Sequence, residues 1–508
     1  MDTPSLHRLG PIAAEVEAVL ARLRRERIVP RILDRDHTVW RDDPTEITNR
    51  LGWLDSPTAM VLHLPAIREV MAAAVRDGCT HALLLGMGGS SLAPEVFRRV
   101  FGVQPGHLDL AVLDSTDPTA VLARARELTP ATTLYLPATK SGGTVETMSF
   151  AKFFFNKART ALGAERAGKR FVAITDPGSG LADLAASLGF RHTFLNDPKI
   201  GGRYSALSCF GLVAAGAVGV DLERLLARAR AADTDEAAVL GVALGAAALA
   251  GRDKVTLIAS SAIAPFGAWV EQLIAESTGK EGRGIVPVDN EPAVAPARYG
   301  NDRLFVHLRL ADDDGEDQRV EALAAAGHPV LRIELSDLYD LGREFMRWEL
   351  ATAVAGWVLG INPFDQPDVE AAKVLARQMV QTYRQEGRLP SLEPTLREGE
   401  LTYIGEGRPA NLREALDHLL AAARPGRSYV AIQAFLPSTP AIEALLAGMR
   451  RSILERTGMA TTVGYGPRFL HSTGQLHKGD AGHGLFLQLT ADPSEDAPIP
   501  DEPGSDRS

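Results

Sequence analysis

Short apolar runs alternate with stretches of helical periodicity along most of the chain. A first set, HALLLGMG, LDLAVLD, TTLYLPA and RFVAITD, begins at Thr80, and a second set, KVTLIAS, RLFVHLRL and PVLRIEL, begins at Lys254. Runs that are apolar throughout are typical of parallel strands in a sheet covered by helices on both faces. The pattern therefore predicts an α/β fold of two doubly wound parallel-sheet halves, joined by a helical stretch from Tyr204 to about Gly251.

The two ends of the chain show other patterns. Apolar positions from Ala14 to Arg25 recur at helical spacing and predict a helical lead-in. The runs SYVAIQAFL and GLFLQLT, with a helix from Pro440 to about Arg456 between them, predict a small C-terminal α/β appendage. The last stretch, DPSEDAPIPDEPGSDRS, is acidic and rich in proline, which predicts a disordered tail. We expect a lead-in over 1–50, α/β domains over 51–235 and 236–390, the appendage over 391–490 and the tail over 491–508.

Composition narrows the class of protein. The 508 residues are 45% hydrophobic and 23% charged, as in ordinary globular proteins, and the net charge of -10 disfavours a nucleic-acid binder, which needs basic surface. Cys79 and Cys209 form no CxxC pair, so neither a disulfide framework nor a zinc site is indicated. No uninterrupted apolar run reaches about 18 residues, and the first residues do not resemble a signal peptide. We therefore expect a cytoplasmic protein with no membrane partner.

Two loops fall where doubly wound sheets bind their ligands, beyond the carboxyl ends of strands. The first expected strand runs into GMGGSS at 86–91 before a helix begins near Leu92. Its glycines let backbone N–H groups approach an anion, and the helix N-terminus favours negative charge, so the loop is typical of a phosphate site. A purely structural turn fits this motif alone about as well. Ser91 stands where a dinucleotide fingerprint needs glycine, and Asp114 leaves a nicotinamide dehydrogenase as the lowest-ranked alternative.

The second loop, TKSGGT at 139–144, precedes a helix that begins near Val145. It brings three hydroxyls, an ammonium group and free helix N–H donors together, which suits the three acceptor oxygens of a phosphate monoester. Two hydroxyl-rich helix caps are the structural alternative for the pair of loops. Glu146 and Thr147 follow at once and are candidate contacts to the substrate, although a carboxylate at this point also matches the helix dipole.

Three later motifs complete a series. They are GGRYS at 201–205, ESTGK at 276–280 and FDQPDVEAAK at 364–373. Taken singly, they fit a surface arginine, a helix end capped by Gly279 and a solvated charged helix. Together and in this order, the five motifs resemble the phosphoglucose isomerase family, whose fold is two sugar-isomerase (SIS) α/β domains. RDDPTEITNRLGWLD and GYGPRFLHSTGQLHKG extend the resemblance to the isomerase portion of bacterial bifunctional transaldolase/phosphoglucose isomerase proteins, and we assign no transaldolase activity.

The resemblance implies a glucose-6-phosphate isomerase of glycolysis and gluconeogenesis. Such an enzyme interconverts glucose 6-phosphate and fructose 6-phosphate through an enediol or enediolate, needs no metal or cofactor, and is commonly a homodimer. Its phosphate ligands would be Ser90, Thr139, Lys140, Ser141 and Thr144, with Gly88 and Gly89 shaping the loop. Glu276 would be the base, Arg203 the cation beside the enediolate oxygens, and Gln366 with Lys373 the contacts for substrate hydroxyls and ring opening.

The chemistry of these side chains agrees with those roles. A fixed guanidinium stabilises a developing oxyanion without losing its own proton. A flexible glutamate can carry one proton between adjacent carbons on the same face of the sugar.

One position departs from the family pattern. Arg303 stands where the family usually has a histidine in a GxxGQH-like segment, and a guanidinium cannot act as a base near neutral pH. Ring opening then falls to Lys373, to His471 or His477, or in part to spontaneous opening in water. Of these we choose His471, although a histidine in a loop flanked by glycines is also often structural.

Two alternatives of other kinds remain open. One is a phosphosugar sensor, because a SIS fold can bind sugar phosphates without turning them over. The pairing of Glu276 with Arg203 distinguishes an isomerase from a sensor, since a sensor needs no base facing a cation. The other is an isomerase of a related phosphosugar, such as mannose 6-phosphate.

Overall fold

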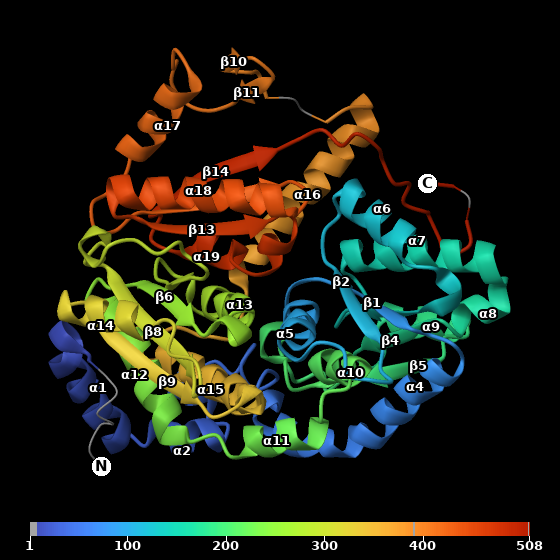
Figure 1. Cartoon of the computed structure of the whole chain (residues 1–508), viewed down its shortest axis with the longest axis horizontal. Coiled ribbons are helices and arrows are strands. Elements are labelled where there is room, and N and C mark those ends of the chain that lie inside the picture. Colours follow the sequence, from blue (N-terminus) through green and yellow to red (C-terminus); the bar gives the residue numbers. More distant parts are fainter. Residues whose placement is uncertain (1–7, 390–391, 506) are drawn as a thin grey trace.

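The structure is a computed structural model that describes residues 8–389, 392–505, 507 and 508, apart from the side chains of residues 368–373. Within these residues the chain forms three α/β units, each built on a parallel sheet (Figure 1). The first two units are the doubly wound halves that the apolar runs predict, and the third is the predicted appendage. The predicted fold class is therefore confirmed.

The first sheet has five parallel strands in the order β2-β1-β3-β4-β5. The strands are β1 (His81–Gly86), β2 (Asp109–Leu113), β3 (Thr133–Ala138), β4 (Val172–Thr175) and β5 (His192–Leu195). The helices around it are α4 (Leu64–Arg76), α5 (Leu92–Phe101), α6 (Pro118–Glu127), α7 (Val145–Leu162), α8 (Ala164–Gly168), α9 (Gly180–Ser187) and α10 (Cys209–Val218). Four of the strands are predicted runs, whereas the short β5 has no counterpart among them.

Alternate residues of these strands enter two separate cores. Leu84 of β1 and Leu134 of β3 join the cluster formed with α4, α5 and α10. Leu83 and Tyr135, one position away on the same strands, join Phe154 of α7 in the second cluster. Side chains alternate along a strand, so a sheet covered on both faces needs an apolar residue at every position. This is why the predicted runs are unbroken.

The second sheet has four parallel strands in the order β7-β6-β8-β9. The strands are β6 (Lys254–Ala259), β7 (Val286–Val288), β8 (Arg303–Leu310) and β9 (Val330–Leu335), and the helices are α11 (Leu222–Arg230), α12 (Thr234–Leu249), α13 (Phe266–Thr278), α14 (Asp317–Ala325) and α15 (Leu341–Leu359). Helices α12 and α15 cross at glycines. A Cβ atom on Gly241 would lie 2.4 Å from the carbonyl oxygen of Ala351, and one on Gly245 would lie 2.5 Å from Cβ of Val358. Only glycine allows this approach.

The N-terminal segment packs on the second unit. It contains α1 (Ala13–Arg25), α2 (Ile28–Leu33) and α3 (Ser56–Ala59). Val16, Leu20 and Leu23 of α1 are buried in the core cluster that α12 also enters. Arg8 forms an isolated antiparallel bridge to Val330 of β9. The predicted helical lead-in is confirmed, and it covers one end of the second unit.

One run, Gly52–Arg76, has the length and apolar composition of a membrane-spanning helix. It is divided into two 3-10 turns and the helices α3 and α4. Leu64, Ile67 and Met71 of α4 are buried in the main core cluster. A core helix passes the same test of length and composition, so this run is weak evidence for a membrane span.

The third unit has three parallel strands in the order β13-β12-β14. The strands are β12 (Tyr429–Phe435), β13 (Ala460–Tyr465) and β14 (Gly484–Thr490), and the helices are α17 (Leu412–Ala421), α18 (Pro440–Thr457) and α19 (Gly474–Gly479), with the 3-10 turn η11 (Arg468–His471). Leu446 of α18 packs on Ile432, while Leu476 of α19 packs on Tyr429 and on Ala275 of α13. The unit therefore lies against the helix that carries Glu276.

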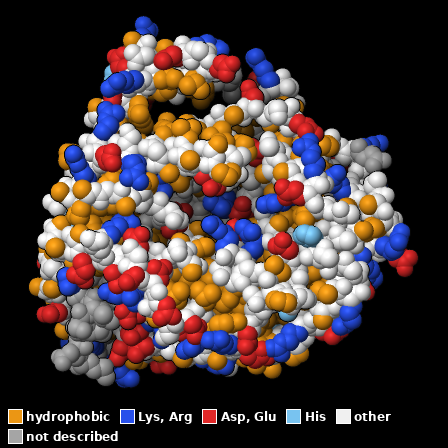
Figure 2. All heavy atoms as spheres, viewed as in Figure 1, with side chains coloured by type: hydrophobic (Ala, Val, Ile, Leu, Met, Phe, Trp, Pro, Cys, Tyr) orange, Lys and Arg blue, Asp and Glu red, His pale blue; other side chains and the backbone are white. Residues whose placement is uncertain are grey.

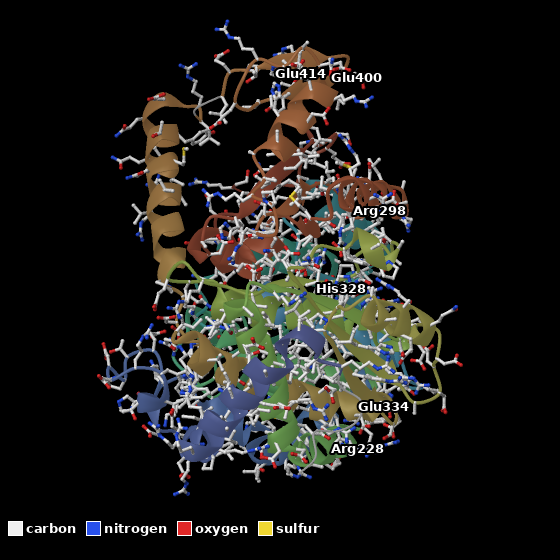
Figure 3. The ribbon with its side chains drawn as sticks, turned by 90° about the vertical axis from the view of Figure 1, so that its left-hand side faces the viewer. Arg228, Arg298, His328, Glu334, Glu400 and Glu414 are labelled. Carbon is white, nitrogen blue, oxygen red and sulfur yellow. The ribbon has the colours of Figure 1, made fainter. Side chains whose placement is uncertain are left out.

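Helix α16 (Pro367–Glu386) links the second unit to the third by way of a hairpin of β10 (Leu396–Glu398) and β11 (Leu401–Tyr403). Figure 3 shows α16 rising along the molecule to the hairpin with open space beside it. Leu375, Met379 and Tyr383 are 63%, 49% and 54% exposed, so the helix presents apolar side chains to solvent.

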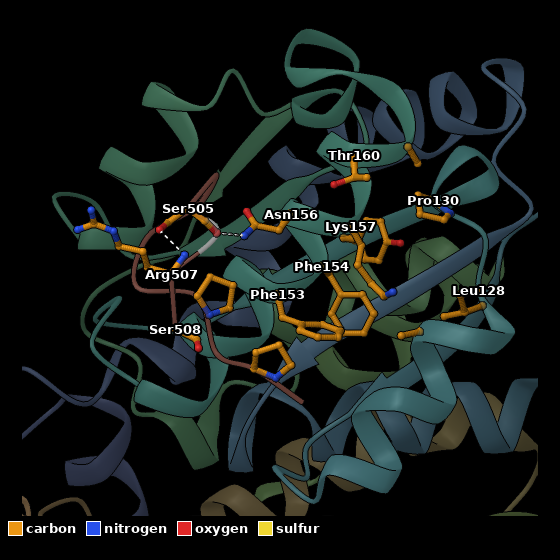
Figure 4. A pocket seen from close by; sticks show the side chains of 15 residues that line it. Leu128, Pro130, Phe153, Phe154, Asn156, Lys157, Thr160, Ser505, Arg507 and Ser508 are labelled. Atoms are coloured by element: carbon orange, nitrogen blue, oxygen red, sulfur yellow. Dashed lines mark hydrogen bonds between the residues drawn. The ribbon is translucent and has the colours of Figure 1, made fainter. Parts of the chain in front are cut away.

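The described residues of the tail beyond β14 form no helix or strand, and the tail runs along α7. The Lys152 ammonium donates to the carbonyl of Asp501, and the Asn156 amide donates to the carbonyl of Ser505, at 2.8 and 2.7 Å. Tail and helix enclose a cavity of about 520 Å³ whose lining includes Phe153 and Pro498 (Figure 4). The prediction of disorder and the expected domain boundaries stay predictions.

Buried charges join the third unit to the second. Arg303, at the start of β8, donates to both carboxylate oxygens of Glu291, at 2.8 and 3.2 Å, and both side chains are fully buried. The Oε1 atom of Glu291 also accepts from the backbone N–H and the hydroxyl of Thr461 on β13, at 2.8 and 3.1 Å. Arg450 of α18 donates to the carbonyl of Asp289 at 2.9 Å. Arg303 thus belongs to the joint between two units.

Glu291→Gln should weaken this joint, because it removes the carboxylate that binds the buried guanidinium of Arg303 most closely and leaves that guanidinium only Asp302, at 4.0 Å. We expect the free energy of unfolding to fall by about 3 kcal/mol, measured by urea denaturation. Glu316→Gln is the control, since the Glu316 side chain is 37% exposed and its partner Arg319, at 3.1 Å, is 23% exposed. That change should shift the free energy of unfolding by less than about 1 kcal/mol. Equal stability of the two variants would contradict a structural role for the Glu291 joint.

Candidate active site

The two predicted anion loops lie side by side. They follow β1 and β3, which are paired in register from His81 with Thr133 to Gly86 with Ala138, so the loops leave the sheet at the same edge. In the first loop Gly88 has a φ of +52°, and Ser90 is partly exposed. A Cβ atom on Gly89 would lie 2.0 Å from the carbonyl oxygen of Gly202. The first loop therefore backs directly onto the GGRYS motif, which only glycine permits.

The second loop is closed by its own side chains. The hydroxyls of Thr139 and Thr144 lie 2.9 Å apart, and the Ser141 hydroxyl accepts from the N–H of Gly143 at 3.2 Å. Gly142 has a φ of +69°, and a Cβ there would lie 2.5 Å from the backbone nitrogen of Leu181. Ser141 is exposed and Thr144 partly exposed, at the N-terminus of α7. The Thr139 side chain is buried, at 2% exposed, so Ser141 and Thr144 are the more accessible hydroxyls beside the N-terminus of α7.

Lys140 points its ammonium at protein groups. It pairs with Asp176, at the end of β4, and donates to the carbonyl of Pro198 at 2.7 Å. Burial raises the pKa of Asp176 above its usual value, and the charge of Lys140 offsets part of that rise. Of the two members of the pair, Lys140 is the more exposed, at 30% against 11%. Its predicted contact to a phosphate stays a prediction.

Glu276 and Arg203 meet in the interior. Glu276, on the last turn of α13, is 8% exposed, and Arg203, in the 3-10 turn η7 (Gly202–Tyr204), is 2% exposed. One Glu276 oxygen lies 3.3 Å from a guanidinium nitrogen of Arg203 and accepts from the amide of Gln366. The other accepts from the amide of Gln272 at 3.0 Å. The structure therefore brings together three residues that the motifs predict, and adds Gln272.

Arg203 is fixed on its other sides as well. Its Nε donates to the hydroxyl of Ser277 at 2.7 Å, and its Nη2 donates to the carbonyls of Pro363 and Asp365 at 2.7 and 3.2 Å. The Tyr204 hydroxyl lies 3.4 Å from the same serine oxygen. These contacts leave the guanidinium in one orientation, with its Nη1 directed at Glu276.

His471, in η11 of the third unit, reaches the first unit. Its Nε2 lies 2.8 Å from Oε1 of Glu146, in the first turn of α7 beside the second anion loop. Burial raises the pKa of Glu146, but the hydrogen bond and charge of His471 outweigh it, so the pKa lies below its usual value. The backbone carbonyl of His471 accepts from Gln272 at 2.8 Å. Gln272 therefore connects the histidine loop to Glu276.

His477 has different surroundings. Its ring lies 5.1 Å from Phe486, 6.2 Å from Tyr429 and 6.4 Å from Phe469, measured between ring centroids. Burial lowers the pKa of His477 to about 4. This histidine is therefore neutral and lies among aromatic rings of the third unit. Among the described side chains, His471 contacts the predicted site residue Glu146, whereas His477 lies 3.4 Å from the amide of Gln433.

Two other predicted residues contribute less to the described site. Thr147 is fully buried, and its hydroxyl has no hydrogen-bond partner among the described residues, so its contact to the substrate stays a prediction. The side chain of Lys373 lies outside the described residues, although its backbone belongs to the second turn of α16.

Gln272 is the contact that sequence reasoning missed. It lies four residues before Glu276, so both side chains project from the same face of α13. That spacing was the available signal. Glu276, Arg203 and His471 lie where the three units meet. Figure 2 shows charged side chains gathered around a hollow in the middle of the face of the molecule that it draws.

Comparisons with known proteins indicate the same family as the sequence motifs. The family model described as phosphoglucose isomerase matches residues 70–281. A glucose-6-phosphate isomerase from Rubrobacter xylanophilus is 31% identical over 429 residues, which cover 74% of this chain and 96% of that protein. One from Thermus thermophilus is 28% identical over 65% of this chain and 89% of its own length.

Solved structures share the fold. A crystal structure of a hypothetical protein from Thermus thermophilus superposes with a TM-score of 0.61 at 26% identity, over 74% of this chain and 99% of that one. A glucose-6-phosphate isomerase from Chlamydia trachomatis gives the same TM-score at 19% identity, over 73% of this chain and 86% of that one. With its motifs, its fold and a 31% identical relative matched over almost its whole length, the chain belongs to the phosphoglucose isomerase family.

Proposed function

We propose that the chain is a glucose-6-phosphate isomerase, which interconverts glucose 6-phosphate and fructose 6-phosphate. The observation that carries the proposal is the contact of Glu276 with the buried guanidinium of Arg203 at 3.3 Å. Proton abstraction next to a carbonyl needs a base and leaves negative charge on oxygen. A carboxylate beside a fixed cation supplies both requirements in one place.

Glu276 takes the proton from C2 of the open-chain aldose and returns it to C1, and the reverse transfer starts from C1 of the ketose. The C1=O double bond of the aldose becomes a C1=C2 double bond, and the oxygens of this enediolate carry the negative charge. The hydroxyl proton of O2 passes to O1, and the C2=O bond of the ketose forms as C1 takes back the proton from Glu276. Arg203 stabilises that charge, because its three sets of protein contacts hold it in place before the reaction. The amides of Gln272 and Gln366 direct both carboxylate oxygens.

The phosphate of the substrate lies between the two anion loops. Ser90 of the first loop and Thr139, Ser141 and Thr144 of the second supply hydroxyls, and the N-terminus of α7 supplies N–H donors. Lys140 adds positive charge from behind the loop, where Asp176 holds it. This arrangement places the phosphate beside Glu146 and therefore beside the histidine loop.

Ring opening is assigned to His471. The cyclic sugar must lose a proton from its hydroxyl while its ring oxygen gains one, and an imidazole can mediate both transfers near neutral pH. The contact of His471 Nε2 with the ionised Glu146 at 2.8 Å orients the imidazole ring. Lys373, on the second turn of α16, remains the proposed partner for substrate hydroxyls together with Gln366.

Glu276→Gln tests the proposed reaction. The amide keeps the shape of the carboxylate but cannot accept the proton, so we expect kcat to fall by at least about a thousandfold while substrate still binds. The measurement is a coupled assay of EDTA-treated protein with fructose 6-phosphate, following glucose 6-phosphate. Calorimetric titration with fructose 6-phosphate measures binding.

Glu281→Gln is the matched control. Glu281 lies five residues further along, is exposed and pairs with Arg41 on the surface, so its loss should change kcat less than twofold. Undiminished turnover by Glu276→Gln would remove this residue from the mechanism. Binding without any turnover by the unchanged protein would favour a phosphosugar sensor, and turnover of mannose 6-phosphate alone would reassign the substrate.

His471→Ala tests the assignment of ring opening. We expect kcat for fructose 6-phosphate to fall about a hundredfold, since general acid–base catalysis of this kind contributes at least that much. An analogue that lacks the C5 hydroxyl cannot close the five-membered ring, so its conversion should slow less than about threefold. Glu146→Gln should also lower kcat more for fructose 6-phosphate than for the analogue, by a smaller factor than His471→Ala. An equal loss on both substrates would contradict the ring-opening role.

The resemblance also predicts a homodimer, and the apolar side of α16 supports it. Leu375, Met379 and Tyr383 are about half exposed or more, and a second copy would remove them from water. Light scattering should therefore give twice the chain mass of 54.4 kDa. Leu375→Glu with Met379→Glu should give the single mass, and a monomeric unchanged protein would contradict the proposal. A cytoplasmic location stays a prediction.

A further inference from the structure

Lys280 buries a full positive charge beside the proposed base. It follows the end of α13, four residues after Glu276, and its side chain is 0% exposed. An ammonium group in the interior is costly unless it is paired and hydrogen-bonded. The contacts of this lysine therefore identify what its charge is used for.

The Lys280 ammonium makes two contacts to one residue. It donates to the backbone carbonyl of Asp365 and to the carboxylate of Asp365, each at 2.7 Å. The same carbonyl accepts from Arg203 at 3.2 Å, and Arg203 also holds the carbonyl of Pro363. The segment before α16 is thus held by two buried cations from two different elements.

This segment leads directly into the site. Gln366 follows Asp365 and donates its amide to Glu276, and α16 begins at the next residue. Gln366 itself is exposed, so its own burial does not fix it. The position of its amide depends on the residue before it, which Lys280 and Arg203 hold.

We propose that Lys280 is a positioning residue for the isomerisation, which through its double contact to Asp365 holds Gln366 and the first turns of α16 against Glu276. The inference rests on the proposed function, because it assigns a role within that active site. A lysine suits the task better than an arginine, since one compact ammonium reaches a carbonyl and a carboxylate of the same residue.

The charges around Lys280 are balanced. Among the described side chains, Arg203 of η7, Glu276 of α13 and Asp365 before α16 interact with it, so two cations face two carboxylates. Burial, followed by the charge of Arg203, lowers the pKa of Lys280 to about 8, while Asp365 and Glu276 act in the opposite direction. The ammonium is therefore charged below about pH 8 and loses its proton as the pH rises through that value. The contact to Asp365 should weaken over the same range.

The test compares three variants in the fructose 6-phosphate assay from pH 6 to pH 10. In the unchanged protein, kcat should fall on the alkaline side with an apparent pKa near 8. Lys280→Met should lower kcat at pH 7 at least tenfold and abolish this alkaline fall, with a smaller effect on KM, since the phosphate loops are untouched. Asp365→Asn keeps the hydrogen-bond acceptors but removes the charge that raises the pKa of Lys280. The alkaline fall should therefore move to lower pH.

Glu281→Gln is the control here too, because it removes a carboxylate from the neighbouring residue without touching the Lys280 ammonium. It should leave the pH profile unchanged. An alkaline fall at the same pH in Asp365→Asn and the unchanged protein would overturn the proposal, even if Lys280→Met failed to fold. Absence of turnover by the unchanged protein would instead overturn the proposed function, so the two failures are distinguishable.

Discussion

Arg203 and Glu276 are buried together, and their burial constrains the positions of the elements that surround them. A buried ion pair is tolerated only where the remaining donors and acceptors of both groups are satisfied. The guanidinium meets this condition through Ser277 and two carbonyls of the segment before α16. The carboxylate meets it through two glutamine amides. Satisfying the pair therefore requires α13, η7 and the start of α16 to meet at one point, and that point is the site.

The third unit packs close to this ion pair, because glycines of the GMGGS and ESTGK motifs let its backbone approach. A Cβ atom on Gly88 would lie 2.5 Å from the carbonyl oxygen of His471, and one on Gly279 would lie 2.2 Å from Cα of Leu476. The Gln272 amide then bonds that same carbonyl of His471. The GMGGS and ESTGK motifs thus admit the backbone of the third unit close to the base. Glycine in these motifs serves this close packing as well as the approach of an anion.

The sequence predicts seven of the nine strands that the structure describes in the first two units and misses β5 and β7. Strand β7 has three residues with a proline among them, and β5 is partly exposed, so neither gives an unbroken apolar run. The motifs likewise predict that Glu276, Arg203 and Gln366 converge. They could not decide between His471 and His477, because only the packing of aromatic rings around His477 separates a core histidine from one that reaches a carboxylate. Gln272 requires the helical register of α13, which no motif supplies.

The exchange at Arg303 and the presence of His471 are parts of one arrangement. The resemblance predicts a histidine at the position of Arg303, and the structure shows the fully buried guanidinium of Arg303 bound to Glu291. Glu291 in turn holds Thr461 of β13, so the arginine helps to fix the third unit. That unit carries His471 and delivers it to Glu146 across the anion loop. The residue that replaces the expected histidine thus supports the element that brings another histidine to the site. A histidine at 303 alone would therefore not restore the family pattern, because Glu291 would lose the buried guanidinium that binds both of its oxygens.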